Sequence, residues 1–397
     1  MKMTLPRSTF CLALLFALGI MSSSNLVCSA PPGGGTATLP KYTIQYLPTL
    51  NGTSSTGTQT TGVWSITYGM NNLGDVVGVS DKGNGTSGPF VYIRSSGTIV
   101  DLGQLTDTTT GGVWWIAQAT AINDAGQIVG YGYLPGWPKT KVHAAYRYTP
   151  GTGKIENLSA TLPTGDQAVA TAINESGDVA GRYSSGGLWK SFLWMSGTTF
   201  SLDLGQLSSG HYTQANAISD RSLLQNVFVA GRADTANGSR AWRYDATTGS
   251  MVNLGTLKTT SGTAQSQGLD MNNAGDVTGW STSGRNTRAF VAAPSTSMLD
   301  LGTLGGTSSD ATCINDSGVV AGDSKTSSGL WRAFVYKKLT GMFALDPQVT
   351  GLDTSKLLNG RIYATRINTG GQICGPGGEG FNFNGVHGQA YILTPTL

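Results

Sequence analysis

The sequence predicts an all-β protein, a seven-bladed β-propeller of four-stranded blades that is closed by its N-terminal strand. Three observations lead to this fold. A turn motif occurs seven times along the 397 residues. The spacing of its copies matches the length of a four-stranded propeller blade. An unpaired strand lies near the N-terminus, whereas the last repeat lacks its final strand.

The turn motif is clearest in Ser309–Ser324, where one strand ends at Ile314-Asn315 and a second begins at Val319. Asn and Asp favour tight turns, and Gly adopts positive φ without steric cost. The repeated Asn residues are therefore predicted to form turns rather than to bind a ligand. The seven copies are anchored at Met70-Asn71, Ile122-Asn123, Ile173-Asn174, Ile218-Ser219, Met271-Asn272, Ile314-Asn315 and Ile367-Asn368. Successive anchors are 43 to 53 residues apart.

Two further strands follow each turn motif. In the third strand, for example Arg332–Tyr336, aromatic, branched and small residues alternate as a packed sheet requires. The fourth strand ends in a Leu-rich phrase, but none follows Ala390–Leu393. We expect Tyr42–Leu47 to complete the last blade and remove an open sheet edge. The fourth unit has a longer connection, Ser222–Asn226, which predicts a locally remodelled turn.

One stretch carries a resemblance to a known family. The phrase LGTLGGTSSDATCINDSGVVAGDS from Leu301, followed by RAFVY from Arg332 and a Gly-Met turn, resembles the repeat of the HAF-repeat family of extracellular repeat proteins. The resemblance covers nearly all of the chain after its N-terminal segment. It implies export and a β-repeat architecture, but no defined activity. The position of the His in the family's name-giving triplet is held here by Gly88, Ala144, Lys190, Arg240, Arg288, Arg332 and Gln389.

The N-terminal segment has the features of a secretory signal. Lys2 and Arg7 supply positive charge, residues 10–21 are apolar, and small residues follow. An apolar stretch of about a dozen residues is too short to span a bilayer, which needs roughly twenty. We therefore assign 1–29 to a signal peptide, 30–40 to a linker and 41–397 to the propeller domain. We expect a secreted protein, with a periplasmic or cell-surface location as the alternatives.

Composition and motifs narrow the possible partners. Only 12% of the residues are charged and the net charge is +3, so neither nucleic acid nor an anionic membrane is an expected partner. The sequence contains no catalytic-serine elbow, zinc-protease motif, P-loop or calcium loop, so we predict no cofactor and no metal site. Cys313 and Cys374 remain after signal removal. Cys374 occupies a repeat position that holds Val, Ala or Thr elsewhere, so it is predicted to be a small buried residue, with a disulfide to Cys313 of the adjacent unit as the alternative.

The loops between strands two and three and between blades are long and variable, which is typical of binding loops on a rigid scaffold. Aromatic residues concentrate in these loops, where flat rings can stack on sugars. Alternatively, the rings fill the central channel or cap the blades. The predicted ligand-binding residues are Trp64, Trp114, Trp115, Trp137, His143, His211, Tyr212, Tyr363 and His387. Because Trp114 and Trp115 are adjacent, we expect only one of them to face a ligand.

These features favour an exported binding or interaction module that recognises an extracellular carbohydrate or surface polymer. One alternative is a polysaccharide lyase or glycoside hydrolase acting at the same face, and another is a structural surface protein without a small-molecule site. Hydrolysis would need two carboxylates close together on that face. The candidates are Asp81, Asp107, Asp166, Asp310, Asp353 and Glu379, and the sequence singles out no pair.

Overall fold

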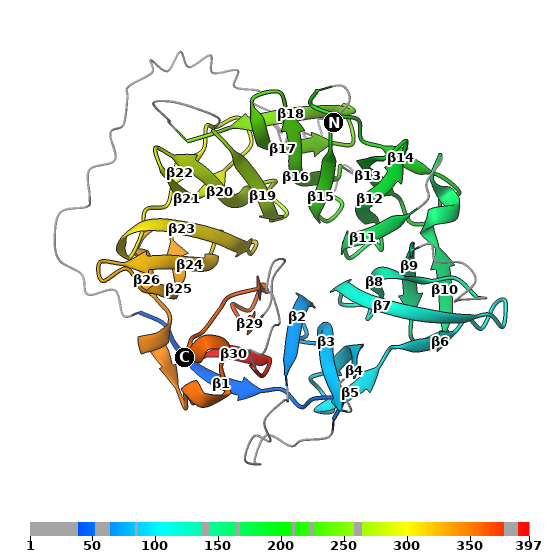
Figure 1. Ribbon diagram of the computed structural model, residues 1–397, viewed down its shortest axis with the longest axis horizontal. Coiled ribbons are helices and arrows are strands. Elements are labelled where there is room, and N and C mark those ends of the chain that lie inside the picture. The colour runs from blue at the N-terminus through cyan, green and yellow to red at the C-terminus, as the bar shows by residue number, and fades with distance from the viewer. Residues whose placement is uncertain are drawn as a thin grey trace, which may run out of the picture. The chain divides into compact units, whose positions relative to one another are not determined.

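The computed structural model describes residues 39–51, 64–83, 86–135, 143–163, 167–208, 211–222, 226–257, 264–376 and 388–396. They belong to one compact unit that begins at Leu39. Within this described part, the strands form seven sheets, which follow one another around a ring (Figure 1). The fold is the predicted β-propeller. No helix of the described residues is long and apolar enough to cross a membrane.

The first four blades follow the chain in order, and the strand that leads into each turn motif lies nearest the ring axis (Figure 1). Blade one contains β2 (Ser65–Met70), β3 (Val76–Gly83), β4 (Thr86–Ile93) and β5 (Thr98–Asp101). Blade two contains β6 (Gln104–Thr106), β7 (Val113–Ile122), β8 (Ile128–Tyr133), β9 (His143–Thr149) and β10 (Lys154–Asn157), followed by the short 3-10 helix η1 (Leu158–Thr161). Blade three contains β11 (Ala168–Ile173), β12 (Val179–Ser185), β13 (Leu188–Trp194) and β14 (Ser201–Asp203). Blade four contains β15 (Thr213–Ile218), β16 (Phe228–Thr235), β17 (Gly238–Asp245) and β18 (Ser250–Gly255).

The last three blades include the point where the ring closes. Blade five contains β19 (Ser266–Met271), β20 (Val277–Ser283), β21 (Asn286–Ala292) and β22 (Leu299–Asp300). Blade six contains β23 (Gly305–Ile314), β24 (Val320–Thr326), β25 (Trp331–Lys337) and β26 (Gly341–Ala344). Three short 3-10 helices follow: η2 (Asp346–Gln348), η3 (Thr354–Lys356) and η4 (Leu358–Gly360). Blade seven contains β28 (Arg366–Ile367), β29 (Ile373–Gly375), β30 (Tyr391–Thr396), β1 (Lys41–Tyr46) and β27 (Val349–Thr350).

The N-terminal strand closes the ring, as predicted. β1 pairs antiparallel with β30 along its whole length, from Lys41 opposite Thr396 to Tyr46 opposite Tyr391. Its other edge pairs in parallel with the short β27. The Tyr42 side chain is buried in the core between blades six and seven. The first strand of the described chain is therefore part of the last blade.

The turn asparagines connect each blade to the next. In blade two, Asn123 Oδ1 accepts a hydrogen bond from the Gln127 N–H in its own turn at 2.9 Å. Its Nδ2 donates to the Asn174 carbonyl of blade three at 3.0 Å. Equivalent bonds to the following blade are made by Asn71, Asn174, Asn272, Asn315 and Asn368. These side chains both form the turns and link neighbouring blades, so the prediction that they are turn-formers is confirmed.

The turn of blade four differs, as its longer connection predicts. Ser219 occupies the asparagine position and accepts the bond from blade three through its carbonyl. Arg221 reaches back to blade three, where its Nε donates to the buried carboxylate of Asp178 at 2.7 Å. An ion pair thus accompanies the Asn-to-Ser change in this part of the turn.

A glycine in the second strand of each blade allows the two inner strands to approach closely. In blade four, a Cβ on Gly231 would lie well under 3.0 Å from the Gln214 carbonyl oxygen of β15. The same clash with the inner strand would occur at Gly78, Gly130, Gly181, Gly279, Gly322 and Gly375. Next to this contact, β15 has a β-bulge between Ala215 and Ala217, and the inner strands of five other blades are bulged at the same place.

The two cysteines contribute to the core rather than to a crosslink. Cys313 and Cys374 are free thiols, and both side chains are fully buried. Burial raises the pKa of each thiol. The structure therefore agrees with the prediction that Cys374 is a small buried residue and not with the disulfide alternative.

We expect Gly231→Ala to lower the free energy of unfolding by about 3 kcal/mol or more, because the new methyl group overlaps the backbone of β15. The matched control is Gly151→Ala, since no atom lies within 4 Å of a Cβ at that position. The control should change stability by less than about 1 kcal/mol. Urea unfolding of both variants measures the difference, and equal stabilities would contradict the role assigned to the close strand approach.

Candidate functional site

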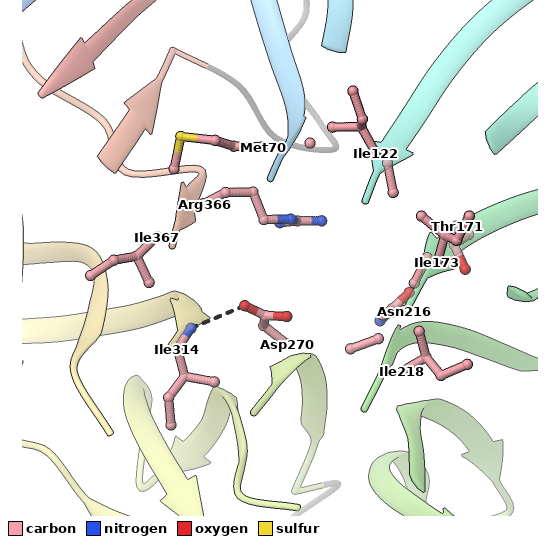
Figure 2. A pocket seen from close by; sticks show the side chains of 14 residues that line it. Met70, Ile122, Thr171, Ile173, Asn216, Ile218, Asp270, Ile314, Arg366 and Ile367 are labelled. Carbon is pink, nitrogen blue, oxygen red and sulfur yellow. Dashed lines mark hydrogen bonds between the residues drawn. The ribbon is translucent and has the colours of Figure 1, made fainter. Parts of the chain in front are cut away.

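A cavity of about 160 Å³ lies on the ring axis, between the inner strands of all seven blades. The hydrophobic anchors of the turn motifs lie around this cavity and come from different blades (Figure 2). These anchors are Met70, Ile122, Ile173, Ile218, Ile314 and Ile367. The repeat itself therefore places one anchor from each of six blades around the axis.

Two opposite charges lie among these anchors. The position before the anchor holds a small residue in five blades, namely Gly69, Ala121, Ala172, Ala217 and Cys313. Blade five has Asp270 at this position and blade seven has Arg366. Both side chains line the cavity, and Figure 2 shows them projecting toward the axis from different blades. The sequence analysis missed both residues, although aligning the seven anchors would have found them.

The two charges are held in place by backbone groups. Asp270 Oδ2 accepts a hydrogen bond from the Ile314 N–H of blade six at 3.0 Å (Figure 2). Arg366 Nη1 donates to the Thr365 carbonyl at 3.0 Å. Neither group takes part in an ion pair within 4.0 Å among the described residues. Burial raises the pKa of Asp270, while the charge of Arg366 and the Ile314 N–H act to lower it.

The predicted aromatic residues fall into two groups. Trp114 is only 3% exposed and packs edge-on against Tyr146 in the core of blade two. Tyr363 is also 3% exposed, and the guanidinium of Arg361 lies 4.1 Å from its ring centroid. Neither ring offers a face to solvent. Trp115, at 37% exposure, is the member of the tryptophan pair that faces outward.

The other predicted site residues lie at the starts of strands or outside the described residues. Trp64 is partly buried just before β2. His211 is partly buried, and its carbonyl accepts a hydrogen bond from Gln206 Nε2 at 2.5 Å. Trp137 and His387 lie outside the described residues. Of the nine predicted positions, His143 and Tyr212 have the most informative surroundings.

His143 and Tyr212 belong to a group of aromatic and arginine side chains that spans blades two, three and four. We call this group the rim arc; its members are Tyr131, Tyr133, His143, Arg182, Trp189, Tyr212, Gln214 and Arg232. The His143 ring lies 4.9 Å from the Tyr131 ring and 5.0 Å from the Tyr133 ring. Its Nε2 is 3.1 Å from the Tyr133 hydroxyl. Burial lowers the pKa of His143, which favours the neutral ring.

The arginines of the rim arc connect blades three and four. Arg182 Nη1 donates to the Tyr212 hydroxyl at 2.8 Å and to Gln214 Oε1 at 2.7 Å. The Arg182 guanidinium lies 5.0 Å from the Trp189 ring, and that of Arg232 lies 5.0 Å from the Tyr212 ring. The Nε atoms of both arginines are buried without a hydrogen-bond partner among the described residues. The guanidinium groups of Arg182 and Arg232 thus both contact Tyr212.

The rim arc has a simple origin in the repeat. The residue directly after the strand-two glycine is Val79, Tyr131, Arg182, Arg232, Trp280 or Asp323 in blades one to six. The flanking glycine is invariant among the repeats because of its close contact, whereas this next position carries a different chemistry in nearly every blade. Arg182 and Arg232 were not among the predicted site residues, because they lie within strands and the prediction rested on loop composition.

A third group consists of carboxylates near blade six. Asp310 on β23 and Asp323 on β24 are directly opposite each other in the antiparallel pair. Arg332 Nε lies 3.1 Å from Asp346 Oδ2. The Oδ1 atoms of all three aspartates and Nη1 of Arg361 are buried without a hydrogen-bond partner among the described residues. This concentration of unpaired polar atoms is unusual, because buried polar groups are normally bonded.

The carboxylates that were predicted as candidates for hydrolysis have different surroundings in the structure. Asp310 joins Asp323 and Asp346, which the sequence analysis did not select. Three others have local structural roles: Asp81 accepts from Asn51, Asp107 caps the loop at Thr109, and Asp353 caps η3 at Ser355. Asp166 and Glu379 lie outside the described residues.

Burial raises the pKa of Asp323 to about 7, with Arg361 lowering it and Asp310 and Asp346 raising it further. The folded state therefore holds this proton more tightly than the unfolded state, and its contribution to stability is lost as pH rises from about 4 through 7. A full three-unit shift corresponds to about 4 kcal/mol at 1.4 kcal/mol per unit. The neighbouring acids titrate together with Asp323. We therefore expect Asp323 to contribute roughly half of this free energy to the pH dependence of stability.

In Asp323→Asn, the free energy of unfolding should accordingly change by about 2 kcal/mol less between low and high pH than in the wild type, since asparagine mimics the protonated acid. Chemical denaturation of the wild type and the variant at about pH 4 and about pH 8 measures this change. The variant should be the more stable of the two at the higher pH. Parallel stability profiles for the two proteins would show that Asp323 ionises normally.

Comparisons with known proteins find only distant structural likenesses. No family model matches the chain, and no curated protein matches it. An oligogalacturonate lyase in complex with manganese resembles it at 12% identity and a TM-score of 0.47, over 90% of this chain and 97% of that one. A puromycin hydrolase resembles it at 11% identity and a TM-score of 0.46, over 76% of this chain and 56% of that one, so this chain spans about half of that structure. The β-propeller domain of the Trilobed protease from Pyrococcus furiosus resembles it at 9% identity and a TM-score of 0.37, over 72% of this chain and 97% of that one. Likenesses at this level say nothing about activity.

Proposed function

We propose that this protein is an exported binding module whose rim arc recognises an acidic extracellular carbohydrate or surface polymer. The observation that carries the proposal is the pair of arginines beside Tyr212. Each has a buried Nε without a partner among the described residues, and each lies against an aromatic ring. Such a surface offers both charge and flat apolar faces to a ligand.

The chemistry of the rim arc fits an acidic sugar. Arginine presents a planar fork of N–H donors that matches a carboxylate or sulfate in a bidentate arrangement. Tyrosine and tryptophan rings supply the apolar faces on which sugar rings stack. His143 adds no positive charge when neutral, so Arg182 and Arg232 provide the attraction. The net charge of the whole chain is only +3, so recognition depends on this local pair.

Export is supported by the predicted signal peptide and by the resemblance to the HAF-repeat family. An extracellular location would give the rim arc access to surface polymers. The buried free thiols Cys313 and Cys374 are compatible with an oxidising compartment, because burial and a raised pKa make a thiol unreactive.

A second candidate function, glycoside hydrolysis, is favoured by one observation. Asp310 and Asp323 are cross-strand neighbours, so their side chains lie on the same face of the sheet. Retaining glycosidases use two carboxyl groups about 5 Å apart, one of which has a raised pKa and acts as the acid. Asp323, with its pKa of about 7, matches the acid. This reaction would produce new reducing ends, which binding alone does not.

We expect Arg182→Ala to weaken binding to polygalacturonate by at least about tenfold, because one charge-assisted fork is lost. Arg285→Ala is the matched control, since Arg285 is exposed at the turn between β20 and β21, outside the rim arc. Arg182→Lys, which keeps the charge but loses the fork, should be intermediate. Affinity electrophoresis at low salt measures retention, with neutral dextran as the reference polymer.

The outcomes separate the two functions. Retention on polygalacturonate that Arg182→Ala abolishes and Arg285→Ala preserves supports the binding module. Reducing ends that disappear in Asp323→Asn would establish the hydrolase instead. Equal behaviour of the two arginine variants, or equal retention on dextran, would contradict recognition by the rim arc.

A further inference from the structure

We propose that the axial cavity is a separate binding site for a small zwitterion, such as a small α-amino acid. In this arrangement the ligand ammonium faces Asp270 and its carboxylate faces Arg366. This site is built from the inner strands and does not depend on the function proposed for the rim arc.

The first argument is that the fold does not need these charges. Five of seven blades have Gly, Ala or Cys at the position of Asp270 and Arg366, and four of these five, blades one, two, three and six, still make the asparagine contact to the next blade. Burying a charge costs free energy unless a partner compensates for it. Two charges of opposite sign at positions that otherwise hold small residues are therefore explained better by a ligand than by stability.

The second argument is that the charges do not neutralise each other directly. No ion pair within 4.0 Å joins them, although Arg366 acts electrostatically on Asp270. Space remains between them, because the cavity has a volume of about 160 Å³. At about 30 Å³ per water molecule, this is room for about five waters or one small organic molecule.

The third argument concerns the charge of the ligand. A simple cation at Asp270 would be repelled by Arg366, and a simple anion at Arg366 would be repelled by Asp270. A molecule with both charges satisfies both residues at once.

The remaining polar groups of the wall are already engaged in the fold. The Thr171 hydroxyl donates to the carbonyls of Ala180 and Ala215. Asn216 Nδ2 donates to the Gly268 carbonyl, and its Oδ1 accepts from Gln214 Nε2. Recognition of charge therefore falls to Asp270 and Arg366.

The test measures the melting temperature and the heat of binding of the full-length protein with glycine, alanine, valine and leucine. Methylamine and acetate serve as probes that carry one charge each. The wild type should bind at least one of the amino acids and respond more weakly to either single-charge probe. Asp270→Ala and Arg366→Ala should each weaken amino-acid binding by at least about tenfold.

Both alanine variants introduce the residue that blades two, three and four carry at this position, so they should fold. Asp270→Asn and Arg366→Gln provide a second pair that preserves the volume of each side chain. Arg285→Ala, at the exposed turn between β20 and β21, is the control that should retain amino-acid binding. A wild type that responds to no amino acid would overturn the proposal. Binding that survives in the Asp270 and Arg366 variants, or that methylamine or acetate alone reproduces, would overturn it as well.

Discussion

The bond from each turn asparagine to the backbone of the next blade is the interaction on which the rest of the structure depends. Each amide uses its oxygen within its own turn and its nitrogen on the neighbouring blade, as Asn123 does with Gln127 and Asn174. A buried amide that lost either partner would incur its full desolvation cost. The bonds therefore fix the separation of neighbouring turns, and they bring the preceding hydrophobic anchors together around the axis.

The sequence was sufficient to predict the fold because the repeat encodes it locally. The turn asparagines and glycines recur from repeat to repeat along the chain. The absence of a fourth strand from the last repeat pointed to closure by β1. The site was harder to predict because side-chain direction depends on register and on bulges, which local patterns do not reveal. Trp114 and Trp115 illustrate this limit: alternation predicts that one is buried, but only the pairing with β6 and β8 decides which one.

Departures from the repeat are a more direct guide to function than the loops are. The constant positions of each blade, such as the glycine against the inner strand, preserve packing. The position after this glycine varies from Arg182 and Arg232 in blades three and four to Asp323 in blade six. Basic and acidic groups are thereby placed on different blades of one rigid ring, which gives the molecule distinct chemical sides without a change of fold.

Closure of the ring by β1 also has a consequence for the order of folding. Thr43 of β1 bonds to Thr394 of β30, which is 351 residues away in sequence. Blades one to six pair strands that are close in sequence and can form as soon as they are synthesised. Blade seven instead requires the two ends of the propeller to meet, and contacts of such long range form slowly because the entropy of the intervening chain must be lost first. During synthesis, β1 therefore remains without its main partner until nearly the whole ring has been made.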